Sequence, residues 1–374
     1  MTRRRLSSSR SQHGFTLIEL MVGVLLGLLT MLVITQVTVQ AEGRKRTVSM
    51  GNDAQVNGSL ALYTLQRDLQ MAGYGASASP DALGCPVNSK YDSSGLAFAF
   101  TLAPVVISDG VDGNPDTLTV MQARTHDFSV PIKITENHTQ SGNAFIVQSA
   151  LGVAEGDMMI AVPKTQDALT GCALFSVASD ASSSSTTLGS TRIPHVSKAT
   201  AKWNQSSVFP AGGYVTESYL INMGSMVLRS YTVDSAQNLV ALELSPVTGG
   251  TVNNTLYPQI VNMQALYGKD TDADGVVDSY DTTTPTTGAG WQQVLTVRVA
   301  VVARSNQYEK DAVTSSAPLW NVGTAATVSG VTTSTCHTDS ACIAIKVNHI
   351  SDWQHYRYKV YETVVPLRNV LWNS

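Results

Sequence analysis

The hydrophobic pattern of the chain starts with one long apolar run behind a polar leader. The twenty positions of residues 20–39 include no charged residue, and they are interrupted only by Gly, Thr and Gln36. Twenty helical residues rise about 1.5 Å each, which matches a hydrocarbon core of roughly 30 Å. We therefore predict a helix that crosses a membrane once.

The helical pattern continues beyond the apolar run in an amphipathic form. Leu62, Leu65 and Leu69 recur at helical spacing, and the charged Arg67 stands between them. Gly73 and the residues that follow it mark the end of this pattern. One long helix is therefore predicted to begin in the membrane and to finish packed against a globular domain.

From Ala76 onward the pattern changes to short apolar runs broken by Gly, Pro, Asn, Asp and Ser. Such runs predict strands, and no second long helical pattern accompanies them, so a parallel α/β sheet is disfavoured. The predicted fold class is α+β, with a long N-terminal helix packed on an antiparallel β-rich globular domain. The predicted strands are residues 117–121, 144–148, 158–162, 214–221, 226–233, 239–244, 294–303 and 356–365.

The residues around the start of the apolar run differ from an ordinary secretory signal. Four arginines in the leader keep it on the cytoplasmic side, Gly14 precedes the apolar run, and Glu19 lies at its start. A carboxylate in lipid costs about 2.5–3.5 kcal/mol on insertion scales, so it requires a partner or a function. The alternative is a plain single-span anchor with an incidental Glu.

The sequence Gly-Phe-Thr-Leu-Ile-Glu-Leu-Met-Val-Gly at residues 14–23 resembles the class III signal of type IV prepilins and pseudopilins. The resemblance implies that a prepilin peptidase cuts between Gly14 and Phe15 and methylates the new amine of Phe15. It also implies that the apolar helix stays on the mature protein as membrane anchor and assembly helix. Glu19 would then pair with the terminal amine of a neighbouring subunit.

The bulk composition allows a packed core and excludes one class of partner. The 374-residue chain is 43% hydrophobic and 14% charged, so global disorder is not expected. Its 24 basic and 28 acidic residues give a formal charge of −4, and loss of the four leader arginines leaves about −8. This charge argues against direct binding of nucleic acid by the globular domain.

The cysteine count predicts disulfides. Cys85, Cys172, Cys336 and Cys342 would lie on the far side of the membrane, where an even number favours disulfide bonds. Three pairings are possible. We favour Cys336 with Cys342, which closes a small loop, and Cys85 with Cys172. A zinc site is not expected, because the chain has no Cys-x-x-Cys motif and its histidines are scattered.

One acidic segment, residues 270–281, has the oxygen-ligand spacing of an EF-hand-like calcium loop. Carboxylates fall at its first, third, fifth, ninth and twelfth places, and Gly275 at the sixth allows a sharp turn. The carbonyl of Val276 can supply a further ligand, and Val277 would anchor the loop to the core. The expected ligands of a structural Ca²⁺ ion are Asp270, Asp272, Asp274, Val276, Asp278 and Asp281.

Two departures from the calcium pattern keep a second interpretation open. The twelfth place holds the short Asp281 rather than Glu, and the flanks do not predict two helices. The alternative is an acidic, solvated surface loop. Mutual repulsion of five carboxylates favours the cation, and a weak site of roughly 10⁻⁴–10⁻³ M is expected. A second acidic group, Asp109, Asp112 and Asp116, is interpreted as a turn-rich loop.

The sequence does not predict an enzyme. It contains no Gly-x-Ser-x-Gly, His-Glu-x-x-His, P-loop or Gly-x-Gly-x-x-Gly motif, and the spacing of its histidines matches no catalytic pattern. We therefore expect no catalytic residue and no bound organic cofactor.

Both ends of the chain resemble minor type IV pilins of the PilW family. Leu-Gln-Arg-Asp-Leu-Gln-Met-Ala-Gly-Tyr-Gly at residues 65–75 resembles the family's helix end, and Tyr-Glu-Thr-Val-Val-Pro-Leu-Arg-Asn at residues 361–369 resembles its closing strand. The resemblance implies a cleaved leader at residues 1–14, a long helix at residues 15–75 and a globular ectodomain at residues 76–374. The middle of the chain, residues 76–260, carries little that resembles a known motif.

The PilW resemblance also implies a function and a location. Such minor pilins prime pilus assembly and sit at or near the pilus tip, with other minor pilins, the major pilin and a large tip-associated adhesin as partners. The chain would span the bacterial inner membrane once and then enter the pilus at the cell surface. Two alternatives remain: a minor pseudopilin of type II secretion, and a surface adhesin that uses the pilin helix as its anchor.

Overall fold

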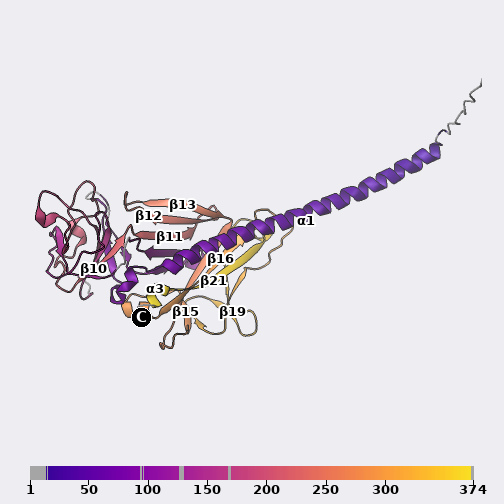
Figure 1. Cartoon of the computed structure of the whole chain (residues 1–374). Coiled ribbons are helices and arrows are strands. Elements are labelled where there is room, and N and C mark those ends of the chain that lie inside the picture. Colours follow the sequence, from indigo (N-terminus) through magenta and orange to yellow (C-terminus); the bar gives the residue numbers. More distant parts are fainter. Residues whose placement is uncertain are drawn as a thin grey trace, which may run out of the picture. The chain divides into compact units, whose positions relative to one another are not determined.

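The computed structural model describes residues 14, 16–92, 95, 97–125, 130–166 and 170–371, and within the first helix it does not describe the side chains of residues 44 and 46–53. The first helix, α1, spans Leu17–Met71 (Figure 1). The chain divides into two compact units, Met1–Asn52 and Asp53–Ser374, and α1 contributes to both. Helix and β-rich region together confirm the predicted α+β class.

In the first unit, α1 is apolar and its described side chains are exposed. The threonines that interrupt the apolar run bond to the helix itself. The hydroxyl of Thr30 donates to the Gly27 carbonyl at 2.9 Å, and those of Thr35 and Thr38 donate to carbonyls three or four residues earlier. A hydroxyl satisfied within its own helix adds little cost in lipid, so these threonines are compatible with a membrane span.

In the second unit, the remaining part of α1 buries one face against the sheets. Leu65 and Leu69 are fully buried, as their spacing predicted, and so is Ala61, whereas Leu62 of the predicted face is half-buried at its side. Gly58 leaves room for the ring of Tyr361, because a Cβ atom at residue 58 would lie 2.3 Å from that ring. The helix therefore lies very close to the strand that carries Tyr361.

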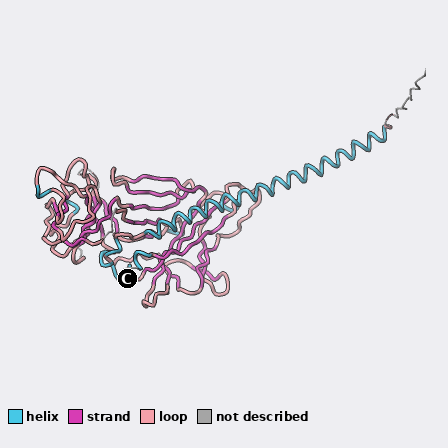
Figure 2. The backbone as a smooth tube through the Cα atoms, viewed as in Figure 1, coloured by secondary structure: helices cyan, strands magenta, loops and turns pink. Residues whose placement is uncertain are grey.

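Five sheets form the rest of the second unit, and most of their neighbouring strands are antiparallel. Figure 2 shows the strands in magenta and the loops that connect them in pink. The six-stranded sheet has the order β2 (Phe98–Thr101), β1 (Pro86–Ser89), β8 (Cys172–Ser176), β7 (Met158–Val162), β10 (Tyr219–Gly224) and β5 (Ile132–Lys133). One five-stranded sheet has the order β13 (Thr251–Pro258), β12 (Asn238–Leu244), β11 (Val227–Val233), β4 (Thr117–Gln122) and β3 (Val105–Ser108).

The second five-stranded sheet has the order β18 (Thr327–Val328), β15 (Ser279–Asp281), β14 (Ile260–Lys269), β16 (Val294–Arg304) and β21 (Tyr358–Pro366). The smaller sheets are β17 (Leu319–Gly323), β20 (Ala341–Ala344) and β19 (Thr333–Thr335), and the pair β6 (Ala144–Ile146) and β9 (Arg192–Pro194). Two short helices, α2 (Gly288–Gln292) and α3 (Arg368–Leu371), and six one-turn 3₁₀ helices complete the described elements.

Two of the sheets are buried on both faces. Along β7, Met158, Ile160 and Val162 belong to the main core under α1, whereas Met159 and Ala161 belong to a second core. Strand β8 alternates in the same way. In the second five-stranded sheet, β14 and β16 are shared between the main core and a third core around Trp320. The six-stranded sheet and the β14–β16 sheet are therefore shared layers between neighbouring cores.

All eight predicted strand runs overlap a strand, with one displaced start. The run predicted at 214–221 becomes β10 only at Tyr219, because Glu217 has a left-handed backbone (φ 73°) that breaks the extended conformation. Thirteen of the 21 described strands, among them β8, β13 and β14, are not among the predictions. Polar Asn262 and Gln264 interrupt the apolar pattern of β14, yet both are buried with their amides bonded to loop carbonyls.

Candidate assembly helix and metal-binding loop

The first residues of α1 form a capping box. The Thr16 hydroxyl accepts a hydrogen bond from the Glu19 backbone N–H at 3.3 Å, and the Glu19 carboxylate accepts one from the Thr16 N–H at 3.1 Å. Such a reciprocal pair satisfies two N–H groups that a helix start leaves free. The signal for it, Thr-x-x-Glu, is present in the sequence and was not used in predicting a role for Glu19.

The processing residues lie just before this cap. Gly14 is exposed and has open space around its Cα, as a peptidase substrate requires, whereas Phe15 lies outside the described residues. Beyond the cap, residues Leu17–Gly43 form a helix long and apolar enough to cross a membrane, the one such helix among the described residues. Gly14, the cap and the apolar helix thus follow one another as a prepilin signal would require.

The acidic loop connects β14 to β15. These strands pair antiparallel, with Lys269 opposite Ser279 and Tyr267 opposite Asp281, so the loop is the connection of a hairpin. Val277 packs at the margin of the third core, as expected for the residue that anchors the loop. Gly275 takes a left-handed backbone (φ 85°), which a side chain would strain.

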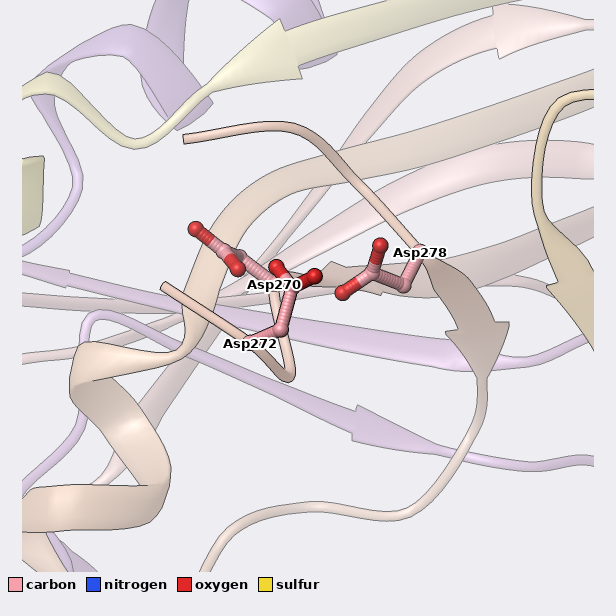
Figure 3. A group of neighbouring side chains, drawn as sticks. All are labelled: Asp270, Asp272 and Asp278. Atoms are coloured by element: carbon pink, nitrogen blue, oxygen red, sulfur yellow. The ribbon is translucent and has the colours of Figure 1, made fainter. Parts of the chain in front are cut away.

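Three of the predicted ligands converge at the hairpin. One carboxylate oxygen from each of Asp270, Asp272 and Asp278 lies within 4.8 Å of the others (Figure 3). Asp270 is buried, and it accepts the N–H groups of Ala273 at 2.7 Å and Gly275 at 2.8 Å, which shapes the turn. Hard carboxylate oxygens in such a group fit a divalent cation, Ca²⁺ in particular.

The carboxylates of Asp274 and Asp281 do not belong to the converging group. The Asp274 carboxylate accepts the N–H of Val276 at 2.7 Å and folds back on its own turn. Asp281 pairs with the Lys269 ammonium at 2.7 Å, because the pairing of β15 with β14 places the two side chains on neighbouring positions of the sheet. In this conformation the described loop has three converging carboxylates rather than five.

The electrostatics of the group differ from residue to residue. Repulsion by Asp274 and Asp278 raises the pKa of Asp272, because their negative charges disfavour its charged form. Hydrogen bonds from the backbone and hydroxyl of Thr271 lower the pKa of Asp278. A cation at the centre would relieve the repulsion on Asp272 and thereby favour the charged form of the whole group.

The disulfides have the pairing that the sequence favours. Cys85 is joined to Cys172 with the Cα atoms 6.0 Å apart, and Cys336 is joined to Cys342 with the Cα atoms 5.8 Å apart. The first bond closes 87 residues and links the start of β1 to β8 inside the six-stranded sheet. The second closes a turn between β19 and β20.

A buried charge network at the end of α1 is absent from the sequence predictions. Arg229 on β11 pairs with Asp68 of α1, and it also binds Glu243 on β12 at 2.6 Å. The hydroxyl of Tyr231 donates to the same Asp68 oxygen at 2.5 Å. The one available signal was a charged residue beside the buried leucines of α1, which could not identify its partners.

Two further buried polar groups also escaped prediction. Asp116, assigned to a turn-rich loop, is fully buried, and its carboxylate accepts the N–H groups of Gly110 and Ala265, so it joins the start of β4 to β14. Burial raises the pKa of Asp116 to about 7. In the second core, the Nε2 atoms of His138 and His195 lie 2.8 Å apart, and burial lowers their pKa values to about 4 and about 3.

Two family models match the chain. The model described as the prokaryotic N-terminal methylation motif matches residues 9–35, and the model described as type IV pilus-assembly protein W (PilW) matches residues 226–369. No curated protein and no solved structure matches the chain. Residues 36–225, which include the second core, lie between the two matches.

A methylation motif that opens a membrane-length apolar helix, followed by a β-rich globular region, defines a protein of the type IV pilin class. Residues 226–369 of the globular region match the PilW family of type IV pilus assembly proteins. This family is structural rather than catalytic, and its members have pilins and the prepilin peptidase as partners.

Proposed function

We propose that this chain is a minor pilin that primes pilus assembly and sits at or near the pilus tip in a complex with other minor pilins. The supporting observation is the combination of an N-terminal methylation motif with a large PilW ectodomain that carries a second core outside the family match. Subunits along a pilus shaft must pack closely, so an ectodomain of this size suits the tip better. The major pilin and a large tip-associated adhesin are the further partners.

The proposed pathway begins in the inner membrane. Prepilin peptidase cuts between Gly14 and Phe15 and methylates Phe15, and the single apolar helix holds the subunit until it enters the pilus. Cleavage frees the amine of Phe15, which stands four positions before Glu19 in the sequence. The capping box offers Glu19 an alternative role within its own helix.

Two substitutions distinguish these roles of Glu19. Glu19→Gln retains a side-chain acceptor for the Thr16 N–H but removes the charge, whereas Glu19→Ala removes both. If the charge pairs with a neighbouring amine, both variants are processed normally and neither enters pili. Normal pilus entry by Glu19→Gln would leave only the capping role. Gly14→Ala is the control for processing: it should block cleavage, so the mass of the mature protein should not be found.

A clean deletion tests the proposed function. Surface pili and secreted exoproteins are scored in the same strain, with the wild-type chain restored from a plasmid as the control. Loss of pili with secretion intact is expected. Loss of secretion with pili intact would identify a type II secretion pseudopilin, and retention of both would identify an accessory adhesin anchored by the pilin helix.

We also propose that the loop between β14 and β15 binds a structural Ca²⁺ ion through Asp270, Asp272 and Asp278. For a site of roughly 10⁻⁴–10⁻³ M, 10 mM calcium would stabilise the fold by about 1.4–2.7 kcal/mol. The melting temperature of the full-length protein in detergent should therefore rise by several degrees relative to chelator. An identical melting temperature in both solutions would refute calcium binding.

Variants of the loop then separate the two possible ligand sets. Asp278→Ala should abolish the calcium-dependent rise in melting temperature, and Asp311→Ala, which removes an exposed carboxylate elsewhere, should leave it intact. Asp274→Ala, which removes the side-chain oxygen, decides between the converging group and the full EF-hand-like set. If the rise persists in Asp274→Ala, the site uses the three carboxylates of Figure 3, and if it is lost, the loop closes further around the ion.

A further inference from the structure

The open edge of the first five-stranded sheet is formed by β13. This strand has eight residues and pairs with β12 on one side only (Figure 1). Among the described residues, no backbone hydrogen bond is made to the other side of Thr251–Pro258. The first five residues of the strand are exposed, so both of its faces are open there as well.

Protein edges usually carry features that prevent further strand pairing, and β13 has few of them. Lysine, charged side chains, proline and bulges are the common protective features. The sequence Thr-Val-Asn-Asn-Thr-Leu-Tyr-Pro has no charged residue, and both its one proline and its one register shift, between Thr255 and Tyr257, lie in the last four residues. Val252 and the threonines favour an extended backbone. The edge is therefore competent to accept another strand.

The direction of β13 is fixed relative to the part of α1 in the second unit. The Asn57 amide donates to the carbonyl of Pro258 at 3.2 Å, at the end of the strand. Near the start of the strand, Val252 pairs with Glu243, whose carboxylate binds Arg229, the partner of Asp68. As the helix numbers rise the strand numbers fall, so β13 runs antiparallel to α1.

The edge strand β21 of the second five-stranded sheet runs in the opposite direction to β13. Strand β21 is the last strand of its sheet, and Tyr361 contacts Gly58 while Asn369, just after the strand, donates to the Ala72 carbonyl at 2.9 Å. Strand β21 therefore runs parallel to α1. If two subunits of this architecture stand side by side with their helices pointing the same way, β13 of one and a β21-like edge of the other are antiparallel.

We infer that β13 is a docking edge for an antiparallel strand from a neighbouring pilin of a different kind. The proposed complex of minor pilins would supply such a neighbour. The inference rests on the proposed function, because assembly into one complex would align the α1 segments of the second units of neighbouring subunits. Main-chain hydrogen bonds would hold the added strand. Pairing of two different edges is heterologous, and such contacts extend an assembly rather than close it.

The register of photo-crosslinks tests this inference. A photoreactive phenylalanine analogue is placed at Asn253 or Thr255 of the full chain in cells with assembled pili, and adducts are mapped by mass spectrometry. Ser334, an exposed residue of another edge strand, is the control position. We expect one adduct segment in a different pilin, and a shift from Asn253 to Thr255 should move the attached residue about two positions back along it.

Other adduct patterns would overturn the inference. The inference is refuted if the adduct yields at Asn253 and Thr255 are no higher than the yield at Ser334. It is also refuted if the attached residue stays the same when the probe moves from Asn253 to Thr255, or if the attached protein is a second copy of this chain. Asn253→Lys supplies an independent measurement: it should lower the adduct yield at Thr255 about tenfold, whereas Ser334→Lys should not. The deletion experiment scores pili separately, so failure of the docking edge and failure of the proposed function are distinguishable.

Discussion

The attachment of α1 to the sheets can be tested at Asp68. Its carboxylate is 7% exposed and accepts from Arg229 and Tyr231, which come from β11. Asp68→Ala removes the carboxylate and leaves the fully buried Tyr231 hydroxyl without that acceptor. Arg229 retains one partner, because Glu243 binds its Nε and terminal nitrogen at 3.1 and 2.6 Å.

The expected cost follows from what remains. Removal of one partner from a buried ion pair costs about 3–5 kcal/mol when the other charge is left alone. Here Glu243 still compensates Arg229, so the charge term should be small, while the unsatisfied hydroxyl costs about 1–3 kcal/mol. We expect Asp68→Ala to lower the free energy of unfolding by about 2 kcal/mol. Asp68→Asn keeps an acceptor for Tyr231 and should cost about half as much.

Urea unfolding of the full-length protein in detergent, followed by tryptophan fluorescence, measures this cost. Arg67→Ala is the matched control, because Arg67 is the adjacent residue and its exposed side chain lies 3.5 Å from Asp68. A pair of that kind is worth about 0–1 kcal/mol. If Asp68→Ala is no more destabilising than Arg67→Ala, the network does not attach the helix. A double-mutant cycle with Arg229→Leu should give a coupling energy of at least about 1 kcal/mol.

Three further predictions concern other buried contacts. Gly58→Ala should lower the free energy of unfolding by about 1–3 kcal/mol, because its Cβ meets Tyr361, and Tyr361→Leu in the same chain should relieve the loss; additive effects in urea unfolding would contradict the contact. Because the pKa of Asp116 is raised, its contribution to folding stability is complete below about pH 4 and is lost as the pH rises through about 7. The free energy of unfolding should therefore fall by about 2 kcal/mol between pH 5 and pH 8 in the wild type, and it should not fall in Asp116→Asn. The lowered pKa values of His138 and His195 change the stability in the opposite direction, because the stability present above pH 6.5 is lost as the pH falls towards 4. Replacement of both residues by Leu should therefore flatten the acid side of the plot of melting temperature against pH, and an unchanged plot would contradict this prediction.

The sequence predicted local features better than partners. A twenty-residue apolar run, a leucine face and alternation along the strands depend on near neighbours, and the membrane-length helix and strands such as β7 and β16 were found in this way. Strand β14 was missed because two buried amides, Asn262 and Gln264, resemble a solvent-facing pattern. Their acceptors come from residues more than eighty positions away, which no local pattern records.

The acidic loop shows the same limit. Ligand spacing identified the segment and its turn, because these depend on the chain itself. Which carboxylates converge depends on the pairing of β15 with β14, which places Asp281 beside Lys269. The capping box at Glu19 was local and could have been predicted from Thr16, but the prepilin resemblance directed attention to a partner outside the chain.

The two-sided burial of β7 and β8 restricts how this protein can be re-engineered or can diversify. The residues of the second core cannot be deleted as a unit, because the deletion would expose one face of β7 and β8, whose other face packs in the main core under α1. Grafting them onto another pilin would likewise require the recipient to adopt half of this scaffold. Sequence variation in this region is therefore expected at its peripheral loops, where a change of side chain leaves the common layer untouched.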